Sequence, residues 1–505
     1  MEIIKINPAD NVAVVLSPVL AGQELEVDGS SLTALADMPF GHKVALVDIP
    51  EGSEVIKYGA PIGIATAFIK AGEHVHTHNV RTGLTEHVDY TYEPVLQETD
   101  SSASSGALLS SDKAAHSSFM GFKRANGRVG IRNEIWIIPT VGCINSTAEV
   151  TARKSQSLLK GSVQGVYSFP HPYGCSQLGE DHKNTQKALC GLVKHPNAGG
   201  VLVIGLGCEN NTIDEMREML GDFDESRVRF LLCQDVDDEI SEAVMLVDEL
   251  ISIASNDERE AVPTSELILG LKCGGSDGLS GITANPLVGA LTDRIVAEGG
   301  SSILTEVPEM FGAETILMNR CESRDVFDKT VKLINDFKEY FISHNQPVYE
   351  NPSPGNKDGG ITTLEDKSLG CTQKAGNATV VDVLSYGEVL NKKGLNLLNS
   401  PGNDLIASTA LAVSGAHIVL FTTGRGTPFG SPVPTVKISS NTPLYDKKRS
   451  WIDFNAGPLA RGASMADTTE ELYSYVLKLA SGEVLSKTEE NGIRDMTIFR
   501  SGVTL

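Results

Sequence analysis

Residues 201–210 read VLVIGLGCEN, an apolar run that ends in glycines and a cysteine. A short, continuous run of this kind is typical of a strand buried on both faces of a parallel sheet. Three other runs end in the same way, in EIWIIPTVGC (134–143), LILGLKCGGSDG (267–278) and SSILTEVPE (301–309). Between such runs apolar residues recur at helical spacing. The chain from residue 119 onward is therefore predicted to be α/β with largely parallel sheets.

The first 97 residues have a different pattern. Short apolar runs such as NVAVVL (11–16) alternate with turn pairs such as Asp28-Gly29, which is typical of a small all-β domain. Residues 98–118 are rich in Ser and Ala without periodicity and are predicted to be a flexible linker. The total of 505 residues suits several domains. We expect a second α/β domain at 119–260 and a C-terminal α/β domain at 261–505.

Acidic side chains dominate the charge, with 65 Asp and Glu against 42 Lys and Arg and a formal net charge of -23. This charge repels polyphosphate, so nucleic acid is not an expected partner. No run approaches the roughly 20 apolar residues of a membrane-spanning helix, and the amino terminus lacks signal-peptide features. Without an export signal, the eight cysteines are expected to be reduced thiols. We expect a cytoplasmic protein that acts on a small molecule, with no membrane partner; homo-oligomer formation is left open.

Half of the cysteines adjoin glycine where a predicted strand turns into a loop: Cys143, Cys175, Cys208 and Cys273. In parallel sheets the crevice beyond the carboxyl ends of the strands binds ligands. Thiolates that meet there would suit iron, either as a single ion or as an iron–sulfur cluster. No CxxC pair is present, so spacing alone does not establish that they meet. The other four are interpreted as small core residues: Cys190, Cys233, Cys321 and Cys371.

Other groups are alternative metal ligands: His171, His182, Glu306 and Glu309. A structural histidine or a solvated glutamate explains each of them as well. A further set suits a substrate with a carboxylate and several hydroxyls: Asp277, Asn351, Asn356, Thr422, Thr423 and Arg425. Lys357 and Lys367 are candidate bases or electrostatic stabilisers, because proton removal next to a carboxylate requires a nearby cation. Either lysine taken alone is equally well explained as a surface residue.

The stretch GEHVHTHN (72–79) raises a separate question. His74, His76 and His78 stand at alternate positions and would share one face of a strand. Three interpretations remain open, namely a metal site, an acid or base, and an exposed strand without chemistry.

Five blocks resemble the altronate and galactarate dehydratase family: GLGCENN (205–211), CGGSDGLSGITANP (273–286), LTEVPEMFGAE (304–314), ENPSPGNKDGGITTLEDKSLG (350–370) and FTTGRGTPFG (421–430). The resemblance extends over the whole chain and implies a SAF-type (β-clip) first domain and iron(II) as cofactor. The implied activity is that of a hydro-lyase in hexuronate (galacturonate) breakdown, which converts D-altronate to 2-dehydro-3-deoxy-D-gluconate and water. On this interpretation the first domain covers the crevice and His74, His76 or His78 supplies an acid or base.

Alternative functions remain. A related sugar acid such as galactarate or talarate would need the same reaction type with different hydroxyl recognition. A sensor that binds a sugar acid without catalysis would need the fold alone. An NAD-linked oxidoreductase is the weakest alternative, because the third glycine of a dinucleotide fingerprint is missing from GLGCENN.

Overall fold

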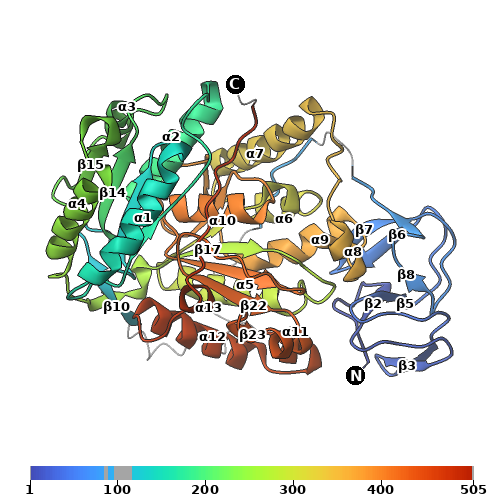
Figure 1. Cartoon of the computed structure of the whole chain (residues 1–505). Coiled ribbons are helices and arrows are strands. Elements are labelled where there is room, and N and C mark those ends of the chain that lie inside the picture. Colours follow the sequence, from blue (N-terminus) through green and yellow to red (C-terminus); the bar gives the residue numbers. More distant parts are fainter. Residues whose placement is uncertain (1, 85–88, 96–116, 503–505) are drawn as a thin grey trace.

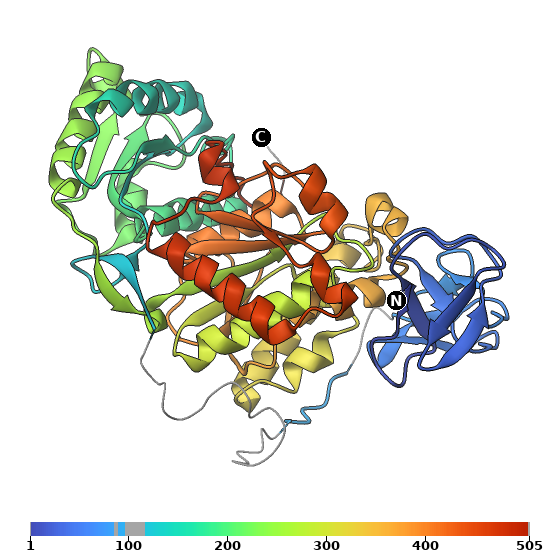
Figure 2. The same ribbon diagram turned by 90° about the horizontal axis from the view of Figure 1, so that it is seen from below.

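The computed structural model describes residues 2–84, 89–95 and 117–502. The predicted linker lies almost entirely outside these residues. Figures 1 and 2 show a small β domain at one end of the molecule, a four-stranded sheet with its helices at the other end, and a larger sheet between them. The all-β first domain and the parallel sheets that follow confirm the predicted fold class.

The first domain consists of short antiparallel strands. One sheet has the order β1-β2-β5-β8 and another the order β6-β7-β9, while β3 and β4 form a hairpin. Their bounds are β1 (Ile3–Ile4), β2 (Val12–Val15), β3 (Glu24–Val27), β4 (Ser30–Thr33), β5 (Lys43–Ala45), β6 (Glu54–Lys57), β7 (Ala60–Ala65), β8 (His74–Val75) and β9 (Val80–Arg81). The pairing of β5 with β8 sets Val44 opposite His74. The strand covers only His74 and Val75, so His76 and His78 lie in the turn that follows it rather than on one strand face with His74.

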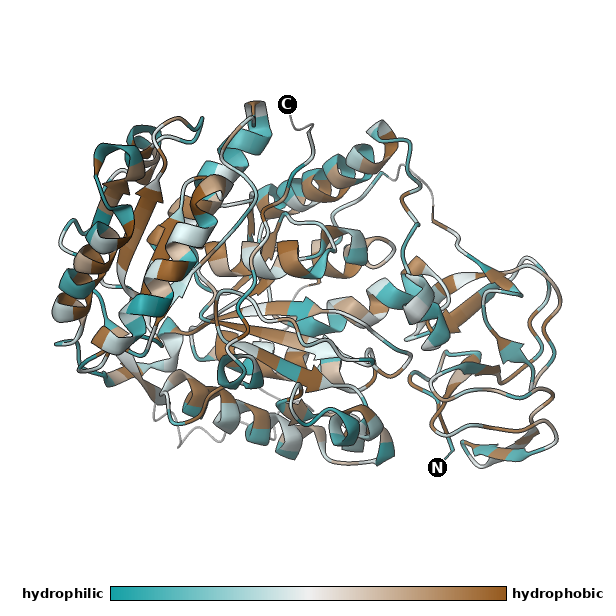
Figure 3. Ribbon diagram, viewed as in Figure 1, coloured by the Kyte–Doolittle hydropathy of each residue, from teal (hydrophilic) through white to brown (hydrophobic). Residues whose placement is uncertain are grey.

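The second sheet is parallel, in the order β13-β12-β14-β15. Its strands are β12 (Glu134–Pro139), β13 (Val166–Ser168), β14 (Ala198–Gly205) and β15 (Val228–Leu232). One face packs on α1 (Asn145–Ser155) and α4 (Glu239–Ala254), the other on α2 (Gly179–Val193) and α3 (Ile213–Leu220). Burial on both faces explains the continuous apolar strands, which Figure 3 shows in brown between helices with hydrophilic outer faces.

The third sheet has seven parallel strands in the order β19-β20-β18-β17-β21-β22-β23. They are β17 (Ile268–Cys273), β18 (Ser301–Leu304), β19 (Val380–Leu384), β20 (Leu395–Leu398), β21 (Ile418–Thr423), β22 (Thr435–Ser439) and β23 (Phe454–Asn455). Its helices are α5 (Ala284–Ala297), α6 (Glu314–Met318), α7 (Arg324–Ser343), α8 (Pro354–Asp358), α9 (Leu364–Cys371), α10 (Asp404–Val413), α11 (Thr442–Lys447), α12 (Met465–Ala480) and α13 (Lys487–Glu490). Helices α2 and α10 pack in one apolar cluster, so the two parallel sheets share part of their core.

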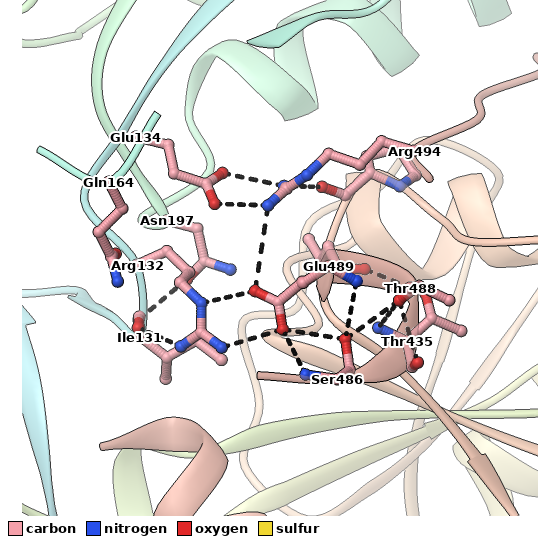
Figure 4. A network of polar contacts seen from close by, with 12 residues as sticks. Ile131, Arg132, Glu134, Gln164, Asn197, Thr435, Ser486, Thr488, Glu489 and Arg494 are labelled. Atoms are coloured by element: carbon pink, nitrogen blue, oxygen red, sulfur yellow. Dashed lines mark hydrogen bonds and ion pairs between the residues drawn. The ribbon is translucent and has the colours of Figure 1, made fainter. Parts of the chain in front are cut away.

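A small antiparallel sheet and an ion network join the second sheet to the third. The sheet consists of β10 (Ser118–Lys123), β11 (Val129–Gly130) and β16 (Glu260–Pro263). In the network, Arg132 Nε donates to Glu489 Oε1 at 2.7 Å and Arg494 Nη2 to Glu134 Oε1 at 2.6 Å (Figure 4). All four side chains are buried, so each charge depends on its partner.

The first domain docks on α9, one of the helices that accompany the seven-stranded sheet. Lys43 Nζ and Lys57 Nζ reach opposite oxygens of Asp366, at 2.8 and 3.0 Å, and all three side chains are buried. Ile62 and Leu369 pack in one apolar cluster across the same seam. Within the part of the chain that the structure describes, no helix is both long and apolar enough to cross a membrane.

Candidate active site at the carboxyl edge of the large sheet

Two cysteines and a glutamate meet where β17 and β18 end. Cys273 is the last residue of β17, Glu309 lies in the turn that follows β18, and Cys371 is the last residue of α9. The two sulfur atoms lie 3.4 Å apart, and Glu309 Oε2 lies 3.0 Å from Cys273 Sγ and 3.1 Å from Cys371 Sγ. Within the described ranges this is the one group of three His, Cys, Asp or Glu ligand atoms that all lie within 4.8 Å of one another.

Three buried lysines surround this group. Lys367 Nζ lies 2.8 Å from Glu309 Oε1. Lys272 forms ion pairs with Glu306 and with Asp404, and Lys374 Nζ lies 3.9 Å from Glu306 Oε2. The edge of the sheet therefore holds positive charge that is screened little by solvent.

These charges set the protonation of the acids. Burial alone would raise the pKa of Glu309, but Lys367, Lys272 and Lys374 together hold it well below its usual range. The hydrogen bond with Cys371 and the charges of Lys374 and Lys272 lower the pKa of Cys273 to about 6, against the effect of burial. The same hydrogen bond and burial raise the pKa of Cys371. Of the two thiols, Cys273 is therefore the more readily ionised.

A cavity of about 570 Å³ opens beside this group. Its lining includes Glu309 and Lys367 together with Asn351, Asn356 and Asp404. Lys367 Nζ donates to the side-chain oxygens of Asn351 and Asn356, at 3.0 and 3.2 Å. The volume is within the range of small-molecule sites, and the lining offers the cations Lys367 and Arg500 and the Asn351 amide beside three carboxylates, Glu309, Glu350 and Asp404. Such a cavity suits a carboxylate with hydroxyl groups.

Local sequence explains how these side chains are aimed. Thr363 caps α9, its hydroxyl accepting from Asp366 N, and the helix then presents Lys367 and Cys371, four residues apart, on one face. Gly274 follows Cys273 in the turn after β17. A Cβ there would lie 2.6 Å from an Asp404 oxygen, so only glycine lets this turn approach the Lys272–Asp404 ion pair.

The histidines of the first domain lie in its seam with α8 and α9. His42 Nδ1 and His74 Nε2 are 3.0 Å apart, His42 Nε2 lies 3.2 Å from the Asp358 carbonyl, and His76 Nδ1 lies 3.0 Å from Thr362 Oγ1. Burial, with the charges of neighbouring residues, lowers the pKa of His74 to about 4 and that of His76 to about 3. His78 is exposed, with its ring centroid 5.2 Å from that of His74. His42 completes this cluster, with its ring centroid 4.9 Å from that of His76.

The structure divides the four cysteines predicted as one ligand set. Cys273 is buried at the end of the seven-stranded sheet, whereas Cys143, Cys175 and Cys208 are exposed and follow strands of the four-stranded sheet. The prediction of one common crevice is therefore corrected, because the strands belong to two separate sheets. The partner of Cys273 is Cys371, which lies four residues after Lys367 on α9. That spacing, one helical turn, was the available signal.

The alternative metal ligands also separate. Glu309 is part of the group with Cys273 and Cys371, whereas Glu306 is paired with Lys272. His171 is buried, and both its ring nitrogens contact backbone groups, at Pro139 O and Tyr173 N. His182 Nε2 lies 3.2 Å from Glu215 Oε2 on α3. Neither histidine reaches the carboxyl edge of the large sheet.

Of the residues predicted to bind substrate, Asn351 and Asn356 line the cavity. Thr422 donates to Asn285 Oδ1, and Thr423 accepts from Gly426 N. The remaining two line a second cavity, of about 520 Å³, between the first domain and the large sheet: Asp277 and Arg425.

Four of the predicted site residues make contacts that show whether they are available to a substrate. They are the two threonines, Asp277 and Lys367. Both threonines are buried and satisfied within the protein. Asp277 accepts from Ser280, Ser440 and Asn441 and so orders its own loop. Of the two candidate lysines, Lys367 lines the first cavity, while half-buried Lys357 lines neither.

Sequence models of known families match nearly all of the chain. Residues 1–83 match the altronate/galactarate dehydratase SAF domain, 121–255 the second domain of D-galactarate dehydratase/altronate hydrolase, and 264–504 the C-terminal domain of D-galactarate/altronate dehydratase. The chain belongs to the altronate and galactarate dehydratase family. The first matched range contains the antiparallel first domain, the second contains the four-stranded parallel sheet, and the third contains the seven-stranded parallel sheet.

Individual members of the family are similar over their whole length. The altronate dehydratase of Escherichia coli K12 is 53% identical over 508 residues, covering all of both chains. The altronate dehydratase of Bacillus subtilis 168 is 53% identical over 99% of each chain. The galactarate dehydratase (L-threo-forming) of E. coli is 31% identical over 97% of this chain and 95% of its own.

Proposed function

We propose that the protein is a hydro-lyase that converts D-altronate to 2-dehydro-3-deoxy-D-gluconate and water, a step of hexuronate breakdown. The observation that carries this proposal is the 53% identity, over essentially the full length, with two altronate dehydratases from distant bacteria. Identity with the galactarate enzyme is much lower, at 31%. The substrate class, a small sugar acid, agrees with a cavity of about 570 Å³ lined by cationic and amide groups.

The reaction removes the proton at C2 and the hydroxyl at C3, and the enol that results tautomerises to the 2-keto acid. Its difficulty is the negative charge that builds up on the carboxylate when the C2 proton leaves. Lys367, at the wall of the cavity, is the group that meets this charge in our proposal, with Lys272 and Lys374 behind it. Asn351 orients a hydroxyl group, and the side-chain oxygens of Asn351 and Asn356 hold the Lys367 ammonium in place. The Asn356 amide nitrogen donates to Ser276 O within the protein.

The donor atoms at the sheet edge fit a metal ion of intermediate softness. Two sulfur atoms and one carboxylate oxygen, 3.0 to 3.4 Å from one another, need to move apart by only a few tenths of an ångström to share one ion. We therefore propose that Cys273, Glu309 and Cys371 hold iron(II). When bound, the ion would act as a Lewis acid that polarises a substrate oxygen.

Proton transfer is assigned to groups that are neutral or basic at pH 7. The lowered pKa values of His74 and His76 keep both imidazoles neutral at pH 7, the protonation state of a general base, and make each a weaker base than free histidine. Neither imidazole lines either cavity, so this role requires the substrate to reach the seam. Both lie on the first domain, in the seam with α8 and α9. We propose that the seam histidines act as proton carriers in the dehydration.

A substrate panel tests the activity. Anaerobically purified full-length protein is supplied with iron(II) and with D-altronate, galactarate or talarate, and formation of the 2-keto acid is measured. We expect kcat/KM for D-altronate to exceed that for either other acid by about tenfold or more, because hydroxyl stereochemistry decides which polar groups find partners. A preference for galactarate or talarate would overturn the substrate assignment. Binding of D-altronate without exchange of its C2 proton into solvent would make the protein a sensor.

A further inference from the structure

Every strand of the four-stranded sheet is followed by a cysteine. Cys143 follows β12, Cys175 follows β13, Cys208 follows β14 and Cys233 follows β15. Because the strands are parallel, all four thiols lie toward the same edge of the sheet. The first three are exposed, whereas Cys233 is half-buried against the core. None of them belongs to the group formed by Cys273, Glu309 and Cys371.

The loops that carry the three exposed cysteines are bound to one another. Gly142 N, beside Cys143, donates to Tyr173 O at 2.8 Å, two residues before Cys175. Ser176 N, beside Cys175, donates to Asn210 Oδ1 at 2.8 Å, two residues after Cys208. Strands β13, β12 and β14 are also neighbours in the sheet. The three thiols therefore come from adjacent loops that form one unit.

The packing beneath these loops is tight. A Cβ at Gly174 would lie 2.0 Å from Thr140 O, so glycine is required for the Cys175 loop to approach the Cys143 loop. Glu209 pins the Cys208 loop, because its carboxylate accepts from the Cys208 amide and from the Thr140 hydroxyl. Asn211 is fully buried among these loops, and its Oδ1 has no hydrogen-bond partner. The loops are thus held rigidly while their thiols remain accessible.

We propose that Cys143, Cys175 and Cys208 together bind an iron–sulfur cluster. A single ion would need all three sulfur atoms within reach of one centre, and they do not form a group within 4.8 Å. Thiolates that bind different irons of one cluster do not need to approach so closely, which suits thiols on three adjacent loops that are hydrogen-bonded to one another. Cys233 is excluded because it is packed against the apolar core. A cubane cluster held by three thiolates would leave one iron without a protein ligand.

The proposed cluster site is connected to the cavity by the carboxyl-terminal segment. Arg500 lines the cavity, and the next residue, Ser501, donates its amide to Asp181 Oδ1 at 2.8 Å. Asp181 lies in α2, six residues after Cys175. The proposal does not depend on the identity of the sugar acid, since it concerns other residues and a different cofactor from the Cys273–Cys371 site.

The test uses full-length protein, reconstituted anaerobically with iron(II) and sulfide. Iron, acid-labile sulfide and visible absorption are measured for the wild type and for Cys143→Ser, Cys175→Ser and Cys208→Ser. We expect acid-labile sulfide in the wild type, with iron exceeding it by the one ion proposed at Cys273, Glu309 and Cys371, and loss of the sulfide to background in each variant. Cys233→Ser is the matched control, since it alters the next strand of the same sheet and should retain the cluster. Because the three varied thiols are exposed, thermal unfolding of the apo variants should match that of the wild type.

Thiol labelling provides a second, independent measurement. In apo protein, iodoacetamide should modify the three exposed cysteines, and reconstitution should protect all three. Iron without sulfide in the wild type would overturn the proposal, as would variants that retain the cluster or reconstitution that leaves the thiols reactive. Loss of the cluster in Cys233→Ser would overturn the assignment of three ligands. Turnover of sugar acids, measured separately, tests the proposed function whatever these results are.

Discussion

The sulfur atoms of Cys273 and Cys371 lie 3.4 Å apart although 98 residues separate them in the chain. One ends a strand and the other ends a helix, and Glu309 closes the triangle from a third segment. Lys367 and its neighbours keep this triangle negatively charged at neutral pH. The chemistry proposed for the site depends on that charge.

Replacement of either sulfur should abolish most of the activity. In Cys273→Ser and Cys371→Ser we expect kcat/KM for D-altronate to fall by about 100-fold or more, because a group at the reacting centre is lost. Cys321→Ala is the control, since Cys321 is also buried but lies away from the cavity. Steady-state kinetics on iron-loaded protein decide the matter. Activity within about twofold of wild type in both serine variants would remove the pair from the site.

Removal of metal should inactivate the enzyme reversibly. Treatment with a chelator is expected to lower turnover to background, and iron(II) to restore it, because the donor set of two thiols and a carboxylate binds such ions through deprotonated ligands. Iron content after gel filtration should fall in Glu309→Gln relative to wild type. Full turnover by protein shown to be metal-free would contradict the proposed cofactor.

Substitution of the buried aspartate in the domain seam should destabilise the docked first domain. Asp366→Asn leaves Lys43 and Lys57 without a countercharge, at a cost of about 3–5 kcal/mol. We expect a lower unfolding temperature and faster proteolysis between the first domain and the remainder. Asp358→Asn, at the exposed end of α8, serves as the control. Equal stability of the two variants would show that the buried pairs contribute little.

Stability should fall as the solution becomes acidic between pH 6.5 and pH 4. Burial lowers the pKa of His74 to about 4 and that of His76 to about 3, whereas each titrates near 6.5 when unfolded. In this window the unfolded chain binds protons that the folded chain does not, so unfolding is favoured as pH falls. The unfolding temperature measured against pH should lose part of this slope in a His74→Gln, His76→Gln double variant. An unchanged slope would show that groups other than His74 and His76 cause the loss of stability at low pH.

Much of the fold could be predicted from the sequence, because strands that are buried on both faces of a parallel sheet have continuous apolar sequences. The runs ending near Cys143, Cys208 and Cys273 are all strands of parallel sheets. Which strands share a sheet is decided by long-range packing that no local pattern encodes. For that reason Cys273 was predicted to share a crevice with cysteines that lie on another sheet.

The site was predicted only in part for the same physical reason. Glu309, Lys367, Asn351 and Asn356 were identified because polar groups gather past strand ends and in the loop that carries the two asparagines. Cys371 escaped notice because burial is also what an inert cysteine shows. His42 escaped because it precedes β5, the neighbour of the histidine-bearing strand, and neighbouring strands are not adjacent in sequence.

The described residues of the first domain and of α9 form an extensive seam between them. It combines the Lys43–Asp366–Lys57 pairs, an apolar contact and hydrogen bonds from Thr82 and Gly83 to Glu365. A protease site placed within residues 100–114 should therefore yield, after cleavage, two polypeptides that elute together and retain turnover. Dissociation upon cleavage would contradict this. Contacts of this kind do not require the two parts to belong to one polypeptide, so the same seam would also serve to join two separate subunits.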